Sequence, residues 1–380
     1  MSKLDDLIKK YCPNGVEFLE IQKCSTFRRG SFPQPYTNEK FYGGKNPMPF
    51  VQVADMKDES LELAKKTKQT ISELAMPKSI FVPKNSILIS IQGTIGRVAI
   101  TQYDCYVDRT ILIFTSISEY FNKKFFAYVL KRKFLYEKNF ARGSTLKTIT
   151  KEELSKYKIP VPPLPVQEEI VRILDSFTKL NEELIKELIN RKKQYEYYRD
   201  NLLNFKDKSI YLPLEQILKI KSGKDYKHLN IGKIPVYGTG GIITYVDEYT
   251  YNKPSVLIPR KGSLEKLYYL DTPFWNVDTV FYTEIFNNVV EKYVFYCLQK
   301  EHLEKLNTAG GVPSLTKRVL NKVRIPIPSL DKQKYIVSIL DKFNTLCNDL
   351  SIGLPAEIEA RKKQYEYYRD KILTFKELKQ

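Results

Sequence analysis

The decapeptide RKKQYEYYRD occupies residues 191–200 and recurs, identical at every position, at residues 361–370. Outward from it, IPVPPLPVQEEIVRILD (159–175) corresponds to IPIPSLDKQKYIVSILD (325–341). The preceding blocks correspond more weakly, as in SILISIQGTIGRVAI (86–100) and SVLIPRKGSLEKLYY (255–269). This self-similarity indicates a tandem duplication, in which a variable block precedes a nearly constant segment in each half. A recent duplication without functional meaning is the alternative explanation of the identical decapeptide.

The constant segments are predicted to be long helices, because apolar and aromatic residues recur in them at heptad spacing. Four prolines between 160 and 165 mark the start of the first helix, which would be about 39 residues and roughly 58 Å long at 1.5 Å per residue. Gly353 and Pro355 predict a local break in the second. The predicted coiled-coil seam consists of Ile170, Leu174, Phe177, Leu184, Leu188, Tyr195, Tyr198, Leu202, Ile336, Leu340, Phe343, Leu350, Tyr365, Tyr368 and Ile372.

Two helices with similar seams, separated by a globular block, pair most simply in antiparallel fashion, which relates the two halves by a pseudo-two-fold axis. Strand-like runs (86–91, 109–115, 255–259 and 278–283) alternate with helical runs (123–139 and 290–306) within the variable blocks. The predicted fold class is therefore α+β, with two globular domains joined by two long helices that form an antiparallel coiled coil.

The charge of the chain suggests a polyanionic partner. The net charge is +18, and it is concentrated in the variable blocks: residues 1–166 carry 27 Lys and Arg against 16 Asp and Glu, and residues 206–330 carry 18 against 12. Residues 167–205, with 7 against 8, are nearly neutral. Nucleic acid is the expected partner, although a lysine-rich proteome would also raise the charge.

The sequence contains no convincing motif of a catalytic site. There is no Walker A loop, only two histidines (His228 and His302) are present, and NPMPF (46–50) has an extra residue compared with the NPP-[YF] motif of adenine methyltransferases. The five cysteines form no C-x-x-C pair, which together with the absence of a signal-peptide core or a long apolar run favours a cytoplasmic protein without a membrane span or zinc ribbon. We therefore expect no enzymatic activity, no cofactor and no metal site.

The chain resembles the specificity subunit of Type I restriction–modification systems. The resemblance rests on the paired segments 159–175 and 325–341, on LPAEIEARKKQYEYYRDKILTF (354–375), and on CPNGVEF (12–18) and GTIG (93–96). It implies a target recognition domain at 1–158, a conserved helical spacer at 159–206, a second target recognition domain at 207–324 and a second spacer at 325–380. GSLE (262–265) departs from GTIG, so we expect that loop to differ in shape.

This resemblance implies that each globular domain recognises one half of a bipartite, asymmetric DNA target, while the helices set the spacing. The implied partners are double-stranded DNA, two modification (adenine methyltransferase) subunits and restriction subunits. An orphan subunit that serves as a recombination donor, a self-contained DNA-modifying enzyme and a structural bridging protein remain as alternatives.

DNA recognition requires basic and hydrogen-bonding side chains on loops, where glycines let the backbone approach phosphates. The predicted contacts of the first block are Arg28, Arg29, Ser31, Gln92, Thr94, Arg97, Arg142, Ser144, Thr145 and Lys147. Those of the second block are Lys221, Lys224, Tyr226, Tyr237, Thr239, Arg260, Lys261 and Ser263.

Overall fold

The computed structural model describes residues 3–137, 148–205, 210–307, 310–349 and 351–378. The chain divides into two compact units. Unit 1 contains residues 1–183 and 358–380, and unit 2 contains residues 184–357. Each unit therefore combines one variable block with parts of both constant segments.

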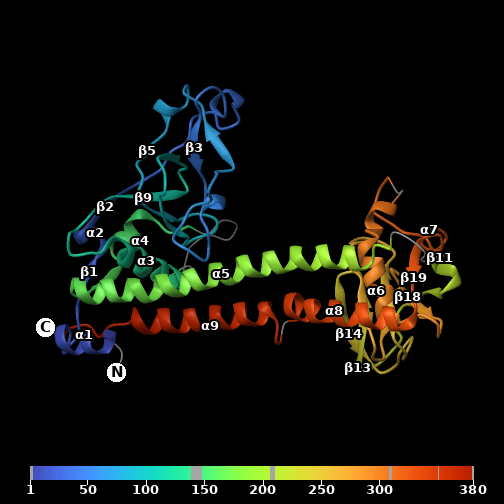
Figure 1. Ribbon diagram of the computed structural model, residues 1–380. Coiled ribbons are helices and arrows are strands. Elements are labelled where there is room, and N and C mark those ends of the chain that lie inside the picture. Colours follow the sequence, from blue (N-terminus) through green and yellow to red (C-terminus); the bar gives the residue numbers. More distant parts are fainter. Residues whose placement is uncertain (1–2, 138–147, 206–209, 308–309, 350, 379–380) are drawn as a thin grey trace. The chain divides into compact units, whose positions relative to one another are not determined.

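Unit 1 contains helices α1 (Lys3–Tyr11), α2 (Ile21–Cys24), α3 (Lys123–Glu137) and α4 (Lys151–Ser155), the first part of α5 (Leu164–Leu202) and most of α9 (Leu354–Ile372). Its strands are β1 (Glu17–Glu20), β2 (Ser25–Arg29), β3 (Met48–Val51), β4 (Gln69–Ile71), β5 (Phe81–Val82), β6 (Ile87–Ser90), β7 (Val98–Ile100), β8 (Cys105–Val107), β9 (Ile111–Ile117) and β10 (Lys158–Val161). In Figure 1, β3 and β5 lie on the far side of unit 1 from its part of α5, and α3 lies next to that helix.

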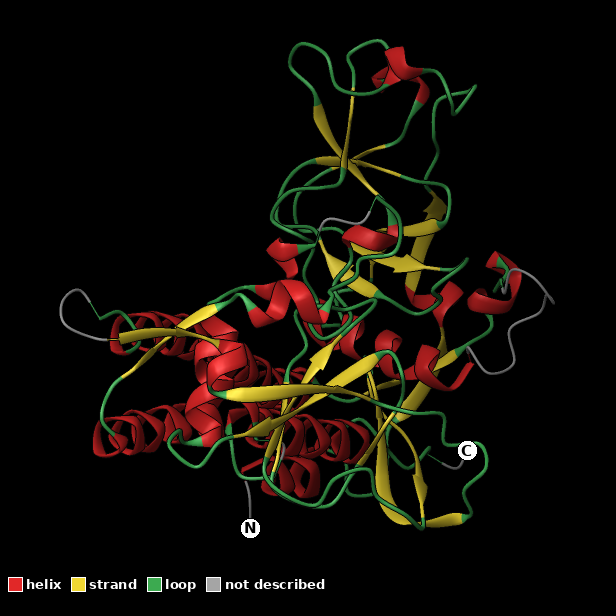
Figure 2. Ribbon diagram, turned by 90° about the vertical axis from the view of Figure 1, so that its right-hand side faces the viewer, coloured by secondary structure: helices red, strands yellow, loops and turns green. Residues whose placement is uncertain are grey.

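Unit 2 contains the second part of α5 and helices α6 (Glu291–Lys300), α7 (Lys317–Asn321) and α8 (Leu330–Asn348). Its strands are β11 (Ile210–Pro213), β12 (Leu218–Ser222), β13 (Ile231–Gly238), β14 (Gly241–Val246), β15 (Ser255–Pro259), β16 (Tyr268–Leu270), β17 (Trp275–Asn276), β18 (Val280–Ile285) and β19 (Arg324–Ile327). As Figure 2 shows, the strands form short separate sheets.

The sheets of the two units have the same topology. The antiparallel sheet β2-β9-β6-β7 of unit 1 corresponds to β12-β18-β15-β16 of unit 2. The antiparallel pair β1-β10 corresponds to β11-β19, and the parallel pair β3-β8 corresponds to β13-β17. The duplication inferred from the sequence is thus present in the structure, with a fourth strand, β5, added to one sheet of unit 1.

The glutamine of the repeated I-P-x-P-x-L-x-x-Q motif has the same role in each unit. Gln167 has no exposed surface; its amide donates to the carbonyl oxygens of Tyr120 (2.7 Å) and Pro162 (2.6 Å), and its Oε1 accepts from the Asn122 N–H (2.8 Å). Because a buried amide is costly unless its donors and acceptors are satisfied, this side chain fixes the start of α5 to the loop before α3.

Gln333 repeats this arrangement at the start of α8. It is fully buried, accepts from the Val290 N–H at 2.8 Å and donates to the Pro328 carbonyl oxygen at 2.9 Å. The repeated glutamine thus explains part of the sequence identity between the two constant segments.

The aspartate that ends each I-L-D motif joins the long helix to the helix of the variable block. Asp175 accepts from the Tyr128 hydroxyl at 2.8 Å and pairs with Lys124 at 2.5 Å. Asp341 accepts from the Tyr296 hydroxyl, and its carboxylate also pairs with a lysine of α6. In both tyrosines, burial and the neighbouring carboxylate raise the pKa of the hydroxyl.

α5 pairs with different helices in the two units. In unit 1, Phe177 of α5 contacts Tyr365 and Tyr368 of α9. In unit 2, Tyr198 of α5 stacks on Phe343 of α8. The earlier part of α5 therefore meets the later helix and the later part meets the earlier one, which is the antiparallel order.

The predicted seam residues differ in burial. Ile170, Leu174, Ile336 and Leu340 have no exposed surface, and Tyr195 is 6% exposed. Tyr198 and Tyr368 are exposed. Leu350 lies outside the described residues. The remaining seam residues are half-buried: Phe177, Leu184, Leu188, Leu202, Phe343, Tyr365 and Ile372.

Several local predictions can be compared with the observed elements. α5 begins at Leu164 and is 39 residues long, and α8 and α9 are separate helices on either side of Gly353, as the sequence predicted. The prediction of one helix over 290–306 is wrong in its second half. α6 ends at Lys300, because His302 adopts the left-handed region (φ 49°) and a 3₁₀ turn follows.

Candidate nucleic-acid interface

A basic turn follows β2 in the sheet β2-β9-β6-β7 of unit 1. Arg28 and Arg29 end β2 and are exposed, and Gly30 follows them. A Cβ atom on Gly30 would lie 2.3 Å from the carbonyl oxygen of Val107, so only glycine fits the turn. Ser31, the next predicted contact, is half-buried.

Unit 2 has the equivalent turn after β12. Lys221 is exposed and lies 3.8 Å from Glu284, and Gly223 occupies the position of Gly30. A Cβ atom on Gly223 would lie 2.2 Å from the carbonyl oxygen of Asn276. The close approach of the two chain segments is therefore repeated, although the basic residues that flank it differ.

The Q-G-T-I-G-R turn of unit 1 lies next to the segment that follows α3. Gln92 forms an isolated β-bridge with Thr148, Gly93 has a φ of +75°, and Thr94 is exposed. The remaining predicted contacts of this block lie outside the described residues: Arg142, Ser144, Thr145 and Lys147.

Arg97 has contacts that the sequence did not predict. Its guanidinium forms a two-point ion pair with Asp58, with both N–O distances 3.0 Å, and donates to the carbonyl oxygens of Val53 (3.1 Å) and Met56 (3.2 Å). Because these bonds occupy the guanidinium, the geometry favours a structural role for Arg97 over a contact with DNA.

The Y-G-T-G-G and P-R-K-G-S turns of unit 2 lie side by side. The rings of Tyr237 and Tyr268 are 5.5 Å apart, and the Tyr268 hydroxyl donates to the Thr239 carbonyl oxygen at 3.3 Å. A Cβ atom on Gly262 would lie 3.6 Å from the Thr239 hydroxyl. The structure thus brings two separately predicted segments together.

The basic residues of the second turn differ in exposure. Arg260 is half-buried, with its guanidinium 5.9 Å from the centre of the Phe281 ring. Lys261 is exposed and forms an isolated β-bridge with Ser314, which is the counterpart of the Gln92 bridge in unit 1. Ser263 is half-buried.

The GTIG and GSLE turns share their first glycine and differ at the last position. Gly93 and Gly262 both have positive φ angles, +75° and +85°. Gly96 also has a positive φ, and a Cβ atom there would lie 2.9 Å from the Cβ of Phe134. Unit 2 has Glu265 at that position, so the second half of its turn is built differently.

The remaining two predicted contacts lie beside the only tryptophan of the sequence. Lys224 is exposed, and its carbonyl oxygen accepts from Trp275 Nε1 at 3.0 Å. Tyr226 is half-buried and packs against the small apolar cluster that contains Trp275. The backbone of Lys224 is therefore held by hydrogen bonds, since its N–H also donates to the Asn276 carbonyl oxygen at 2.9 Å.

Sequence reasoning missed a hollow of about 540 Å³ at the carboxyl ends of the parallel strands β3 and β8. Four side chains with exposed polar or aromatic surface line it: Phe32, Tyr36, Gln52 and Arg109. The Arg109 guanidinium lies 4.5 Å from the centre of the Phe32 ring, and Gln52 donates to the Tyr36 hydroxyl at 2.6 Å. The hollow thus presents an aromatic face beside amide and guanidinium donors, which is the chemistry that contacts bases and phosphates.

Asp108 also borders this hollow, and its carboxylate is used within the protein. It accepts from the backbone N–H (2.9 Å) and the hydroxyl (2.6 Å) of Thr110, so it stabilises the turn before β9. Burial raises the pKa of Tyr36, and the charge of Asp108 adds to that shift. Tyr36 therefore stays protonated and able to donate near neutral pH.

The two copies of the decapeptide have matching buried and exposed faces. Arg199 and Arg369 are nearly buried, each 5.8 Å from the ring of the tyrosine one turn earlier. Tyr197 and Tyr367 are 66% and 62% exposed. Their exposure was not anticipated, because the heptad pattern identifies the seam and not the face opposite to it. The residues exposed in both copies are Lys193, Glu196, Tyr197 and Tyr198, and their equivalents Lys363, Glu366, Tyr367 and Tyr368; Lys192 is exposed only in the first copy.

Among the described residues, no group of three or more His, Cys, Asp or Glu side chains is arranged to hold a metal ion. All five cysteines are buried and unpaired. Helices long and apolar enough to cross a bilayer do not occur in the part of the chain that the structure describes.

The comparisons with known proteins all indicate the same family. Residues 16–194 and 201–360 match the family described as "Type I restriction modification DNA specificity domain". The chain is 36% identical over 262 residues to the EcoR124I/EcoR124II specificity subunit of Escherichia coli, covering 58% of this chain and 64% of that protein. It is 29% identical over 376 residues to the EcoprrI specificity subunit of Escherichia coli, covering 92% and 93%.

Solved structures show the same fold. The S subunit of a type I restriction–modification system from M. genitalium aligns with a TM-score of 0.55 and 20% identity, covering 94% of this chain and 95% of that one. A structure from work on assembly and conformational transition of the type I R-M system aligns with a TM-score of 0.60 and 14% identity, covering 95% and 98%. Two globular domains and a helical coiled coil are thus common to these chains.

Proposed function

Because this chain belongs to the Type I restriction–modification DNA specificity family, we propose that it recognises a bipartite, asymmetric DNA sequence and catalyses no reaction itself. Each unit would recognise one half of the target. The observation that carries this proposal is the combination of a shared sheet topology, apart from the added strand β5, with different basic turns in the two units. A repeated scaffold places the two turns in equivalent positions, and different side chains on them select different bases.

In unit 1, the surface proposed to face DNA comprises the turn after β2 and the hollow beside β3. Arg28 and Arg29 are exposed for phosphate contacts, and Gln52 and Arg109 offer amide and guanidinium donors for base edges. In unit 2, the corresponding surface comprises Lys221, Lys224 and Lys261 together with the paired turns at Tyr237 and Thr239. The excess positive charge of both variable blocks supports this assignment.

The decapeptide faces would each dock one modification subunit. Both present the same exposed residue types, with Tyr197 and Tyr367 as the most exposed aromatic side chains of the two copies. Exposed tyrosines are frequent anchors of protein interfaces, because a large ring contributes much contact area at low entropic cost. Identical faces would bind two copies of one partner, and the coiled coil between the units would set the spacing of the half-sites. Restriction subunits would join this complex.

Salt dependence of DNA binding tests the recognition role. The full chain, assembled with its modification subunits, should bind duplex DNA with an observed association constant that falls steeply as salt rises, with a logarithmic slope of about −0.9 per phosphate contact. The variant Arg28→Gln/Arg29→Gln should flatten this slope by about two. Replacement of the exposed Lys179 and Lys186 on α5 by glutamine removes the same charge outside the proposed surface and should leave the slope unchanged. An equal effect of both double variants would contradict the assignment.

A further inference from the structure

One loop of unit 1 is held by cationic side chains from three distant parts of the sequence. The loop, residues 53–62, begins with the 3₁₀ turn that follows β3. Arg97 pairs with Asp58 and donates to two backbone carbonyl oxygens at the start of the loop. Lys131 of α3 donates to the carbonyl oxygens of Asp58 and, at 3.3 Å, Ser60. Lys362 of α9 pairs with Glu59 at 2.9 Å.

These three contacts do not contribute equally. Lys362 and Glu59 are both about half exposed, so water screens their attraction and the pair contributes little. Lys131 is 8% exposed, and a buried ammonium group is tolerated only where acceptors compensate its lost hydration. Burial accordingly lowers the pKa of Lys131 to about 8. Of the three cations, Arg97 and Lys131 therefore contribute most to holding the loop.

The fixed loop forms one wall of the hollow described above. Gln52, Val53 and Ala54 line the hollow, and the Val53 carbonyl oxygen is one of the acceptors for Arg97. The backbone that positions Gln52 is therefore tied directly to the Arg97 guanidinium. A movement of the loop would move the Gln52 amide relative to Arg109 across the hollow.

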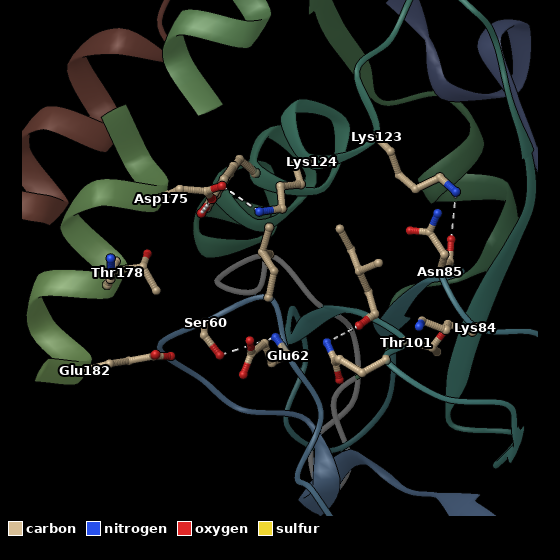
Figure 3. Close-up of a pocket in the computed structure, with 15 residues that line it drawn as sticks. Ser60, Glu62, Lys84, Asn85, Thr101, Lys123, Lys124, Asp175, Thr178 and Glu182 are labelled. Atoms are coloured by element: carbon tan, nitrogen blue, oxygen red, sulfur yellow. Dashed lines mark hydrogen bonds and ion pairs between the residues drawn. The ribbon is translucent and has the colours of Figure 1, made fainter. Parts of the chain in front are cut away.

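The other end of the loop borders a larger cavity of about 810 Å³, which also lies within unit 1. Figure 3 shows Ser60 and Glu62 on one side of this cavity and Asp175, Thr178 and Glu182 of α5 on the other. The loop thus borders open space on the side of α5. Its Met56 and Leu61 side chains are buried in the core of unit 1, and Arg97 and Lys131 bind its polar groups.

Unit 2 is built differently at the corresponding positions. The counterpart of Lys131 is Gln299, which accepts a hydrogen bond from the Tyr195 hydroxyl at 2.8 Å. The counterpart of Arg97 is Lys266, which is exposed. In place of the long connection between β3 and β4, a two-residue turn joins β13 to β14. Loss of the cationic contacts should therefore affect only one of the two units.

We propose that Arg97 and Lys131 are positioning residues that hold the recognition hollow of unit 1 in its DNA-binding geometry without contacting DNA themselves. The inference rests on the proposed function and adds to it the residues that control specificity at one half-site. The inference also explains why the guanidinium of Arg97 contacts a loop of the protein, although Arg97 lies in a glycine-rich turn typical of phosphate contacts.

The test uses the full chain assembled with its modification subunits. Lys131→Met removes the ammonium group and keeps the apolar stem, and Arg97→Met does the same for the guanidinium if the first variant fails to fold. The exposed Lys66→Met is the matched control, because it removes a nearby positive charge that contributes nothing to the loop contacts. Two quantities are measured: hydrogen exchange of residues 53–62, and discrimination against single-base changes in each half of the target.

We expect Lys131→Met to increase exchange in the loop and to reduce discrimination about tenfold at one half-site only, with Arg97→Met affecting the same half-site. Discrimination at the other half-site and in the Lys66→Met control should be unchanged. Faster loop exchange with unchanged discrimination at both half-sites, or equal losses at both, would overturn the inference. A wild-type complex that binds DNA without any sequence discrimination would instead overturn the proposed function, and this inference with it.

Discussion

The ring of Phe177 stacks on that of Tyr368, with centroids 5.6 Å apart and an angle of 23° between the planes. The equivalent residues of the other unit, Phe343 and Tyr198, stack at 5.4 Å and 27°. In each unit the phenylalanine belongs to the start of one constant segment and the tyrosine to the end of the other. The same pair of positions thus forms the same contact twice, as expected for antiparallel helices related by pseudo-two-fold symmetry.

Replacement of Phe177 by alanine should destabilise unit 1 by about 1–3 kcal/mol, because the half-buried ring loses both apolar burial and stacking. Phe343→Ala should have a similar effect on unit 2. Urea unfolding of the full chain, followed separately in the two units by hydrogen exchange, measures both changes. Loss of stability in the unit that was not altered would argue against independent packing of the two pairs.

Replacement of Gln167 by leucine should cost about 1–3 kcal/mol for each backbone group that loses its partner. The N–H of Asn122 and the carbonyl oxygens of Tyr120 and Pro162 are the groups concerned. Gln22→Leu serves as control, since its amide is exposed and bonds only to the nearby Glu20. Equal stability of the two variants by chemical denaturation would show that the buried amide is not needed.

Single replacement of Tyr197 or Tyr367 by alanine should remove one of two bound modification subunits, and the double variant should remove both. Helix content should stay unchanged, because both side chains are largely exposed. Native mass spectrometry gives the stoichiometry, and circular dichroism gives the fold. Full assembly of the double variant would contradict docking at this face.

Glu169 should make the stability of unit 1 depend on pH in the acidic range. The Arg172 guanidinium, together with Lys3, lowers the pKa of this buried carboxyl to about 2, from an ordinary value near 4.5. Its stabilising contribution is complete above pH 4.5 and is lost as the pH falls toward 2, because the unfolded chain binds the proton first. Both cations are exposed, so the contribution is modest.

Urea unfolding of Glu169→Gln between pH 5 and pH 2.5 checks this dependence. The variant should lose less stability over that range than the wild type. Glu168→Gln removes the same charge from the exposed neighbouring position and should retain the wild-type dependence. If the two variants respond alike, the ion pairs of Glu169 are not the cause of the acid sensitivity.

The repeat itself predicted much of the fold. The prolines before α5, the spacing of Ile170 and Leu174 and the glycine near 353 are local signals, and the corresponding helix start, buried face and break are observed. The pairing of the short strands left no such signal, because it joins segments as distant as Glu17 and Val161. Tertiary contacts decide such pairings.

The candidate site was less predictable for the same reason. Glycine-rich basic turns identified Arg28, Arg29, Lys221 and Lys261, which are exposed. The hollow was missed, because its lining comes from three separate stretches, around residues 32–36, 52–54 and 108–110. The contacts of Arg97 within the protein were not predictable either: its local context is typical of a phosphate contact, and its partner Asp58 lies 39 residues away.

A methylation map is the most direct test of whether the two units recognise two half-sites. The chain is co-expressed with the modification subunit of its own system, and N6-methyladenine is located in the host DNA by sequencing. We expect one split motif, with two different half-sites and a constant non-specific gap. A single uninterrupted motif, or no motif although the complex assembles, would contradict recognition of two half-sites by the two units.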